Sequence, residues 1–246
     1  MELNLKMTVQ YDGTRYSGWQ RQGNTENTVQ GRLEKTVSAL LGEPVEIQGS
    51  GRTDAGVHAL GQVAGFHTEA PIPDRTAFRD MLNERLPGDI AVTEVTVASP
   101  RFHARLSAKE KTYRYTVWNS PVPNVLERRY LLQVPEPLDT ASMEEGAHRM
   151  LGTHDFSGFS ADRTKKSTVR CLKSVEIIQN GPRLEIFFTG NGFLRNMVRI
   201  LTGTLLEMGT GRRDPETVDA VFQTCDRSLA GPTAPPQGLC LMEVIY

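Results

Sequence analysis

The glycine-rich segment at residues 49–66, GSGRTDAGVHALGQVAGF, holds the side chains best suited to chemistry. Its glycines permit sharp turns and a close approach of the backbone to a ligand. Asp54 lies in the expected loop, with Arg52 two residues before it. A carboxylate in such a loop can act as a nucleophile or as a general base. The alternative is an aspartate that caps the turn through its own backbone, and for an isolated aspartate the residues alone favour that role.

A histidine follows Asp54 at a spacing of four residues, which raises the question of a metal pair. No third ligand stands at a useful spacing, and His58 opens an expected strand, so we favour a structural role for it. The sequence contains no CxxC pair, no GxxxxGK[ST] phosphate loop and no GxGxxG after a strand. It therefore predicts chemistry by side chains alone, with no metal, no nucleotide and no other cofactor.

Basic side chains gather in two stretches, although the formal net charge of the chain is only −1. Residues 99–116 and residues 160–173 each carry five lysine or arginine residues and one acidic residue. Such stretches suit the phosphate backbone of a nucleic acid, but two solvated surface loops would have the same composition. The basic residues are Arg101, Arg105, Lys109, Lys111 and Arg114 in the first stretch, and Arg163, Lys165, Lys166, Arg170 and Lys173 in the second.

The composition is that of an ordinary globular protein. Of the 246 residues, 38% are hydrophobic and 23% are charged, which is enough to bury a sizeable core. No apolar run approaches the ~20 residues needed to span a bilayer, and the N-terminus has no basic segment followed by an apolar one. Three widely spaced cysteines cannot form a fully paired disulfide framework. We therefore expect reduced thiols and a cytoplasmic protein.

Hydrophobic spacing places the Asp54 loop between two strands. Alternation predicts strands at residues 4–11 and 90–97, and helical spacing predicts helices at residues 28–41 and 75–86. Residues 45–47 and 62–66 are predicted as the two strands that flank the glycine-rich loop. The resulting order, β-α-β-β-α-β, is the split unit of ferredoxin-like folds.

The second half of the chain follows a similar order. Strands are expected at residues 111–118, 172–178, 184–188 and 239–246, with a turn at Asn180-Gly181-Pro182. Helices are expected at residues 141–151, 193–208 and 215–222, the last with Asp214 as its N-cap.

The sequence thus predicts an α+β protein of two pseudo-repeated ferredoxin-like halves, with largely antiparallel sheet and a catalytic cleft between the halves. Residues 1–105 form the expected N-terminal half, which carries the Asp54 loop. Residues 106–246 form the expected C-terminal half.

Six segments, taken in order, resemble segments of the TruA-type tRNA pseudouridine synthases. The resemblance covers essentially the whole chain. One departure is the segment SGFSADRTKKST after Phe156, which bears on contacts with RNA rather than on the reaction. The six segments are YDGTRYSGWQRQ, TVQGRLEKTVSALLGEPV, GRTDAGVHALGQVAGF, RFHARLSAKEKTYRY, NGFLRNMVR and APPQGLCLMEVIY.

The resemblance implies roles for four residues. Asp54 resembles the catalytic aspartate of the family, and Arg199 in NMVR resembles the basic residue that pairs with that aspartate. Tyr113 in KTYRY resembles the tyrosine that stacks on the target uracil. Arg52 resembles the arginine that enters the RNA helix when the target base leaves. Without the resemblance, Tyr113 would be predicted as a core residue and Arg199 as part of a solvated helix face; Arg195 is a weaker candidate for the role of Arg199.

The resemblance further implies a cofactor-free enzyme that converts uridines of the tRNA anticodon stem-loop to pseudouridine, acting as a homodimer that holds tRNA across both subunits. Asp54 would either attack the substrate covalently or remove a proton to give a glycal-like intermediate. A non-catalytic RNA-binding module is one alternative, because ferredoxin-like halves also underlie RNA recognition motifs, although the RNP1 pattern is absent. A metal-dependent hydrolase acting through Asp54 and His58 is the other, and it lacks a third ligand.

Overall fold

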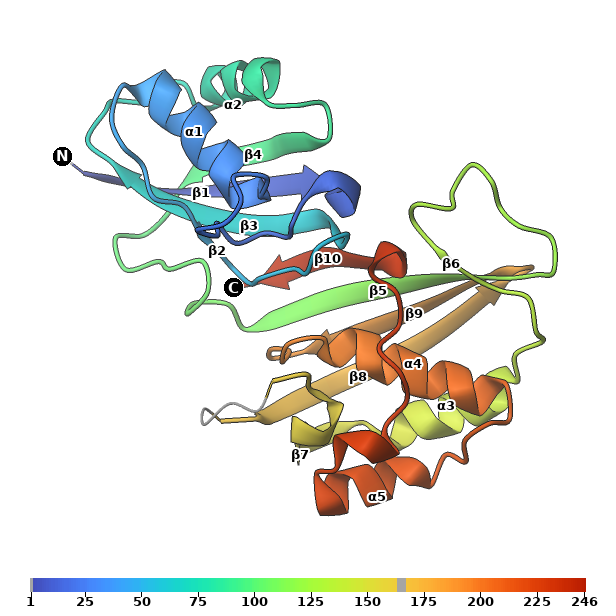
Figure 1. Cartoon of the computed structure of the whole chain (residues 1–246). Helices are drawn as coiled ribbons and strands as arrows, with labels where there is room; N and C mark the ends of the chain where they lie inside the picture. The colour runs from blue at the N-terminus through green and yellow to red at the C-terminus, as the bar shows by residue number, and fades with distance from the viewer. Residues whose placement is uncertain (1, 163–166) are drawn as a thin grey trace. The chain divides into compact units, whose positions relative to one another are not determined.

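The computed structural model describes residues 2–162 and 167–246, and the chain divides into two compact units (Figure 1). Unit 1 consists of Met1–Lys109 and Cys240–Tyr246, and unit 2 consists of Glu110–Leu239. Both units combine helices with β-sheet, which confirms the predicted α+β class. No helix in the described ranges is both long enough and apolar enough to cross a membrane.

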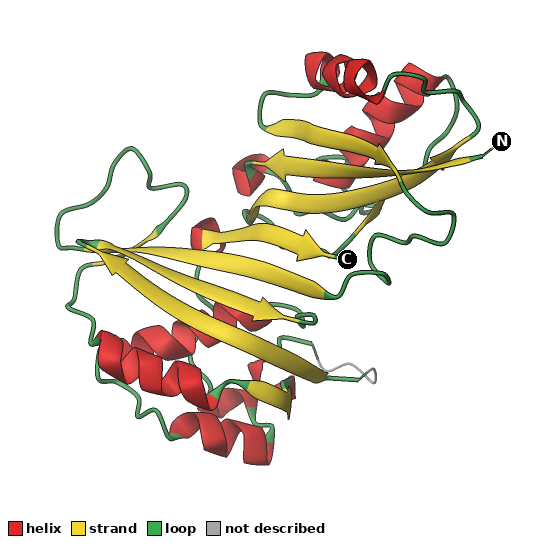
Figure 2. Ribbon diagram, turned by 180° about the vertical axis from the view of Figure 1, so that it is seen from behind, coloured by secondary structure: helices red, strands yellow, loops and turns green. Residues whose placement is uncertain are grey.

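Unit 1 is built on a small sheet with two helices on one face (Figures 1 and 2). Strand β1 (Leu3–Tyr11) pairs antiparallel with both β3 (His58–Thr68) and β4 (Ile90–Val97), so these three strands lie in the order β4-β1-β3. The two-residue strand β2 (Gln48–Gly49) is antiparallel to β3, and β10 (Leu239–Ile245) is parallel to it. Helices α1 (Val29–Leu41) and α2 (Arg75–Arg85) cover the sheet.

Apolar alternation builds the core of unit 1. Leu5, Met7 and Val9 of β1 are fully buried, and each contributes about 1.5–3 kcal/mol of burial free energy. Helix α1 begins after Thr28, whose hydroxyl accepts a hydrogen bond from a backbone N–H of the first turn, and it ends at Gly42 in the left-handed region. The helix thus occupies nearly the same residues as the helix predicted at 28–41.

The strands of unit 2 carry three helices on one face (Figures 1 and 2). Strand β5 (Glu110–Asn119) pairs antiparallel with β9 (Arg183–Gly190), β9 with β8 (Val169–Asn180), and β8 with β7 (Gly152–Asp155). The short strand β6 (Leu132–Val134) is parallel to β5. The helices are α3 (Thr140–Arg149), α4 (Met197–Gly209) and α5 (Thr217–Thr224); short 3₁₀ turns lie at Gly13–Arg15, Ser157–Phe159, Arg227–Leu229 and Pro236–Gly238.

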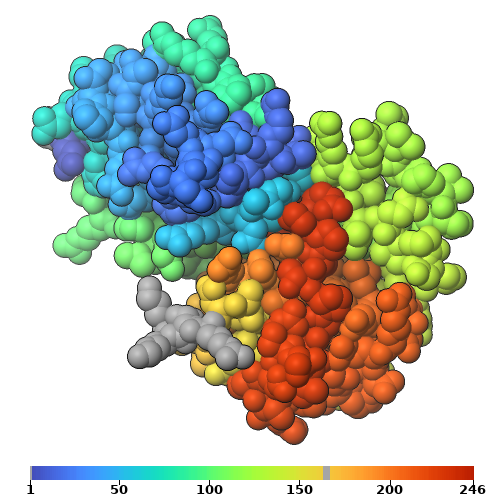
Figure 3. All heavy atoms as spheres, in the orientation of Figure 1, coloured from blue at the N-terminus to red at the C-terminus, as the bar shows by residue number. Residues whose placement is uncertain are grey.

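The connection between β5 and β6, yellow-green in Figure 3, lies on the surface of unit 2 and exposes apolar side chains. Val122 is 70% exposed, Val125 is 61% exposed and Leu126 is 90% exposed. Exposed apolar side chains that cluster in one segment are typical of surfaces that contact another molecule.

The strand predicted at residues 45–47 is wrong. Its apolar residues Val45 and Ile47 are buried, but the segment is not a strand, and the short strand β2 follows it instead. The backbone N–H of Ile47 donates to Glu34 Oε1 at 3.0 Å, and its carbonyl accepts from Gln30 Nε2 at 2.9 Å. Side chains of α1 thus take the backbone groups that a neighbouring strand would otherwise bind.

Two helices begin later than the sequence predicts. Helix α4 starts at Met197 rather than at residue 193, because Asn196 adopts φ 59°, a left-handed conformation that interrupts a helix and that asparagine tolerates. Helix α5 starts at Thr217 with Glu216 as its N-cap, rather than after Asp214. Residues 214–216 form a turn that leads into the helix, in which Thr217 N donates to Asp214 O at 3.1 Å.

The boundary between the units differs from the predicted division at residues 105 and 106. Unit 1 continues to Lys109, whose N–H donates to Ile245 O at 2.8 Å, and it also includes Cys240–Tyr246. The register of β10 explains this grouping, since Cys240 lies opposite His58 and Leu241 opposite Ala59. The end of the chain therefore packs with the strand that follows the Asp54 loop.

Candidate active site

Asp54 lies in the loop of residues 50–57, which joins β2 to β3 in unit 1. The backbone turns here, with Gly56 at φ 80°, a conformation that suits glycine. The carbonyl of Asp54 accepts a hydrogen bond from Val57 N at 3.2 Å. This turn bond uses the main chain of Asp54, while the half-buried side chain keeps partial access to solvent.

The first residues of the same loop are fixed by β3. Ser50 N donates to Val63 O at 2.7 Å, and Ser50 Oγ donates to Gln62 Oε1 at the same distance. The amide nitrogen of Gln62 donates to Gly51 O at 2.9 Å. Both Ser50 and Gln62 are fully buried. The loop therefore leaves the sheet from a rigid, hydrogen-bonded base.

The segment after β1 supports the loop at its centre. Trp19 N donates to Thr53 O at 3.1 Å, and the buried hydroxyls of Tyr11 and Thr53 are 2.8 Å apart. Gly18 has φ 97°, and a Cβ built on it would lie 2.7 Å from Thr53 O and 3.2 Å from Asp54 C. No side chain fits between the two backbones at this point, so glycine is required there.

A second close approach of two backbones lies beside His58, for which the sequence favours a structural role. His58 is buried, and its Nδ1 accepts a hydrogen bond from Gly13 N at 3.1 Å. A Cβ on Gly13 would lie 1.9 Å from Val57 O. The imidazole thus holds the backbone of Gly13 close to the end of the Asp54 loop, as a structural role requires.

The carboxylate of Asp89 holds the segment that carries Gly13. Arg15 Nη2 donates to Asp89 Oδ2 at 2.5 Å, and Tyr16 Oη donates to Asp89 Oδ1 at 2.5 Å. Burial opposes ionisation of Asp89, but the hydrogen bonds from Tyr16 and Arg15 outweigh it and lower the pKa of the carboxyl. Burial, with the hydrogen bond to Asp89, raises the pKa of the Tyr16 phenol. Asp89 therefore stays ionised and keeps this turn in place.

Arg52 is exposed and lies in the same loop as Asp54. Its Nε donates to Gln20 Oε1 at 3.2 Å. Gln20 in turn donates to Gln30 Oε1 at 2.7 Å, on helix α1. The hydrogen bond to Gln20, which is itself bound to α1, thus restrains the Arg52 guanidinium.

Tyr113 lies on β5 in unit 2, where it is 7% exposed. Its ring meets that of Phe193 edge to face, with ring centroids 5.1 Å apart and an interplanar angle of 83°. Tyr115 shares its face of the strand and donates a hydrogen bond to Pro235 O at 2.7 Å. Burial raises the pKa of the Tyr115 phenol, and the charge of Arg199 opposes this in part.

Arg199 lies in the first turn of α4, also in unit 2, and is half-buried. Its Nε donates to Ala234 O at 2.7 Å, and Ala234 N donates back to Arg199 O at 3.0 Å. Its Nη1 is 3.4 Å from Asn196 Oδ1. By contrast, Arg195 is exposed and pairs with Asp162 at 3.1 Å, so its position is that of a surface ion pair.

The segment that holds Arg199 lies directly on α4. A Cβ on Gly203 would lie 1.8 Å from Pro232 O, and one on Gly231 would lie 2.6 Å from Thr204 Cα. Thr204 Oγ1 accepts a hydrogen bond from Gly231 N at 2.9 Å. Residues 230–235 therefore form a strap whose backbone touches the helix, and this strap fixes the orientation of the Arg199 guanidinium.

The structure places Asp54 and Arg52 together in one loop of unit 1, and Tyr113 and Arg199 in unit 2. Sequence reasoning missed Gln20, Gln30 and the carbonyl of Ala234, which position the two arginines. One signal for Gln30 was present: it stands on the predicted helix at i,i+4 spacing to Glu34, among residues that face the core.

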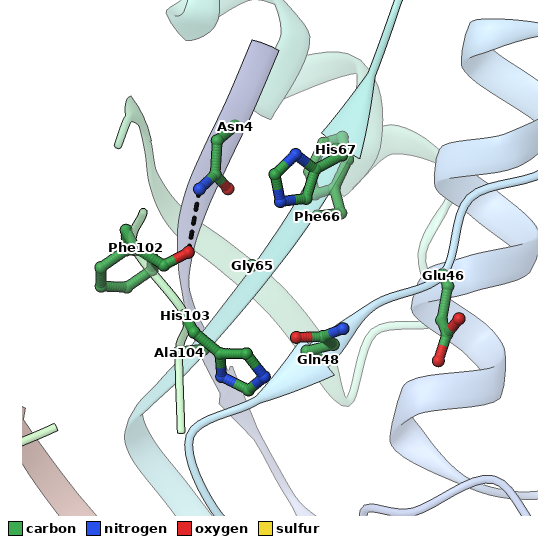
Figure 4. A pocket seen from close by; sticks show the side chains of 9 residues that line it. All are labelled: Asn4, Glu46, Gln48, Gly65, Phe66, His67, Phe102, His103 and Ala104. Carbon is green, nitrogen blue, oxygen red and sulfur yellow. Dashed lines mark hydrogen bonds between the residues drawn. The ribbon is translucent and has the colours of Figure 1, made fainter. Parts of the chain in front are cut away.

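The small hollow drawn in Figure 4 lies elsewhere in unit 1, beside β1 and β3. His67, His103 and Glu46 are among its lining residues. His103 Nδ1 accepts from the N–H of Arg105 at 3.1 Å, so this histidine organises its own loop. Among residues 2–162 and 167–246, no group of three or more His, Cys, Asp or Glu side chains is arranged to hold a metal ion.

The basic side chains of the two stretches differ in their exposure and in their ion pairs. In the first, Arg101, Arg105 and Lys109 are exposed, whereas Arg114 on β5 pairs with Glu185 at 3.4 Å. Lys173 of the second stretch pairs with Glu110. The remaining basic residues of that stretch include Arg163, Lys165 and Lys166, which lie outside the described residues. Exposed basic side chains are thus available on the described surface of unit 1 after β4.

Comparison with known proteins decides the family. Residues 7–105 and 147–246 match the family model described as tRNA pseudouridine synthase. This chain belongs to the tRNA pseudouridine synthase family. Arg52, Asp54 and Arg199 lie within the matched ranges, and Tyr113 lies between them.

Members of the family with close sequences cover almost the whole chain. The protein named tRNA pseudouridine synthase A from Geotalea uraniireducens is 46% identical over 243 residues, which is 98% of this chain and 99% of the relative. The protein of the same name from Pelobacter propionicus is likewise 46% identical over 243 residues, with the same coverage. The protein named tRNA pseudouridine synthase A 2 from Bacillus cereus is 43% identical over 244 residues, which is 99% of both chains. The family resemblance predicted from the sequence is confirmed.

The close approach at Gly18 gives a first prediction. We expect Gly18→Ala to lower the rate of tRNA modification by about 10- to 100-fold, because the added Cβ displaces Thr53 and Asp54. Gly23→Ala in the same segment is the matched control, since no described atom lies within 4 Å of its Cβ position and its φ is not positive. Initial rates of pseudouridine formation, with thermal unfolding as a check on folding, measure both variants. Equal rates for the two variants would show that the Asp54 loop does not depend on this approach.

Proposed function

We propose that this chain isomerises uridines of the tRNA anticodon stem-loop to pseudouridine, with Asp54 as its catalytic carboxylate. One observation carries the assignment to Asp54: within the family match, this half-buried carboxylate stands at a turn whose backbone is held from two sides. Such preorganisation is what a reacting group requires. Because tRNA is the substrate, the proposed place of action is the cytoplasm.

The proposed reaction is balanced within the substrate. The bond between ribose C1′ and uracil N1 breaks, the base turns, and a bond forms between C1′ and C5. The proton lost from C5 is matched by the proton gained at N1, so substrate and product are isomers. No oxidant, reductant or energy donor is consumed, and the proposal includes no cofactor.

Asp54 starts this sequence by one of two routes. It either attacks the substrate to form a covalent intermediate, or it removes a proton to give a glycal-like intermediate. Both routes need an ionised carboxylate in the resting enzyme. Both also need water to be excluded while the glycosidic bond is broken, since water would hydrolyse the intermediate.

Three further residues complete the proposal. Arg199 is proposed as the basic residue that keeps the catalytic carboxylate ionised and oriented. Tyr113 is proposed to stack on the target uracil, for which its aromatic ring is suited. Arg52 is proposed to take the place of the target base in the RNA helix and so to offset the cost of unstacking.

We also propose that the two halves of the chain are a pseudo-repeat of one ferredoxin-like unit. In unit 1, β1-α1-β2 and β3-α2-β4 follow one another, and in unit 2, β5-α3-β8 and β9-α4 follow a similar order, with the short strands β6 and β7 inserted between β5 and β8. A solved structure in which these two sets of elements could not be superimposed would refute the repeat.

The variant Asp54→Asn tests the central proposal. It keeps the size of the side chain but removes the carboxylate, so we expect at least a 10³-fold loss of pseudouridine formation with tRNA binding retained. The assay uses unmodified tRNA and purified protein, without added metal or nucleotide, and binding is measured in parallel. An active Asp54→Asn variant would refute the role of Asp54. If the wild type binds tRNA and modifies no uridine, the chain acts as an RNA-binding module instead.

Arg199→Lys tests the second charged residue. Lysine presents one ammonium, which cannot both replace the Nε bond to Ala234 O and supply a planar pair of donors to a carboxylate. We expect kcat to fall about 10²-fold while tRNA binding changes little. Arg195→Lys, four residues earlier and on the surface, should keep kcat within about twofold. Similar losses in both variants would point to general charge rather than to Arg199 itself.

A homodimer is the remaining part of the proposal. The exposed apolar residues Val122, Val125 and Leu126 between β5 and β6 are of the kind that a subunit interface covers. We expect the purified protein to sediment at twice its mass of 27.3 kDa, and Leu126→Glu to shift it toward the monomer. Sedimentation as a monomer at micromolar concentration would contradict the dimer.

A further inference from the structure

Three polar side chains connect the exposed Arg52 to the interior of unit 1. Arg52 Nε donates to Gln20 Oε1 at 3.2 Å. Gln20 Nε2 donates to Gln30 Oε1 at 2.7 Å, and Gln30 Nε2 donates to Glu34 Oε1 at 2.9 Å. The chain of hydrogen bonds thus runs from the Asp54 loop to α1.

The inner end of this chain is buried and fixed to the backbone. Gln30 is 4% exposed and Glu34 is 6% exposed. Gln30 Nε2 also donates to Ile47 O, and Glu34 Oε1 also accepts from Ile47 N at 3.0 Å. The other carboxylate oxygen of Glu34 lies 3.1 Å from Arg21 Nη1, as an ion pair without hydrogen-bond geometry. Buried groups bound this way hold one arrangement, because releasing any of them leaves a buried polar atom unpaired.

The backbone around Gln30 sets the direction of every bond in the chain. A carbonyl only accepts hydrogen bonds and a backbone N–H only donates, so Gln30 must turn its NH₂ group toward Ile47 O and its oxygen toward Arg21 N, which donates to it at 2.9 Å. The same oxygen then faces Gln20, which must donate its own NH₂ group. The oxygen of Gln20 is therefore left to face Arg52, whose guanidinium only donates. Reversing Gln20 would place two donors against each other, so Gln20 presents an acceptor to Arg52 at a fixed position.

We propose that Gln20 is a positioning residue for Arg52, oriented by Gln30. The inference rests on the proposed role of Arg52 in the reaction. A free arginine side chain at the surface loses conformational entropy when it enters the RNA helix. Restraint by Gln20 removes part of that loss before the target base leaves its stack. The effect falls on the step in which the base leaves, so kcat changes more than the affinity for tRNA.

The test is a double-mutant cycle of Gln20→Met and Arg52→Ala, measured as kcat and KM on unmodified tRNA. Methionine keeps the length of the side chain and removes its hydrogen bonds. We expect Gln20→Met to lower kcat about tenfold, with KM changed less than about twofold. In the Arg52→Ala background, Gln20→Met should have no further effect, since the two residues act as one unit. If Gln20→Met does not fold, Gln20→Ser serves in the same cycle.

Gln22→Met is the matched control. Gln22 is exposed in the same segment and donates to Ser17 O at 2.8 Å, away from Arg52. The Gln22→Met variant should keep the wild-type kcat. This result would show that losing any one amide near the loop is not enough, and that the contact with Arg52 matters.

The outcomes separate this inference from the proposed function. A wild-type rate for Arg52→Ala would refute the role of Arg52 itself, and the role of Gln20 with it. A slow Arg52→Ala beside a wild-type Gln20→Met would overturn the positioning role alone. Losses from the two variants that simply multiply would also overturn it, because Gln20 would then act independently of Arg52.

Discussion

Two stretches of backbone in unit 1 approach each other so closely that no side chain fits between them, and the position of Asp54 depends on this approach. Gly13 lies against Val57 O, and Gly18 lies against Thr53 O. The hydrogen bond from Trp19 N to Thr53 O joins the same two stretches. The loop that carries Arg52 and Asp54 is therefore fixed by its main chain.

Unit 2 positions Arg199 in a similar way. The strap of residues 230–235 lies against α4 at Gly203, and the carbonyl of Ala234 binds Arg199. In both units, a glycine allows a close approach, and a backbone carbonyl accepts a hydrogen bond across it, Thr53 O from Trp19 N in unit 1 and Ala234 O from Arg199 Nε in unit 2. A close approach of two backbones thus positions a loop between strands in unit 1 and the first turn of a helix in unit 2.

The sequence predicted those parts of the fold that depend on local patterns. Alternation predicted β1 and β4, and helical spacing predicted α1 to within one residue at its start. It failed at residues 45–47, because side chains from α1 compete for the backbone there, and no local pattern records that contact. It also placed the start of α4 too early, since only the tertiary structure shows that Asn196 leaves the helical region.

The candidate site was predictable to a similar degree. The glycine-rich segment predicts Asp54 and Arg52 as candidates by residue type, and the family resemblance, now confirmed, predicts Tyr113 and Arg199, whose roles stay proposals. The supporting residues Gln20 and Ala234 were not predictable, because they act across the fold on residues far away in the sequence. A glutamine in a surface segment and an alanine before two prolines have no chemical signal of their own.

The packing of Trp19 has a consequence for spectroscopy. Its indole is 1% exposed, its ring centroid is 6.0 Å from that of Tyr11, and it lies where a side chain on Gly49 would stand. The chain has only one other tryptophan, Trp118, which belongs to unit 2. With Trp118 replaced by phenylalanine, the emission of the protein would come from a single buried indole, on a residue whose backbone N–H donates to Thr53 O of the Asp54 loop. The wavelength of that emission would then report, without any attached dye, whether water reaches the base of the loop.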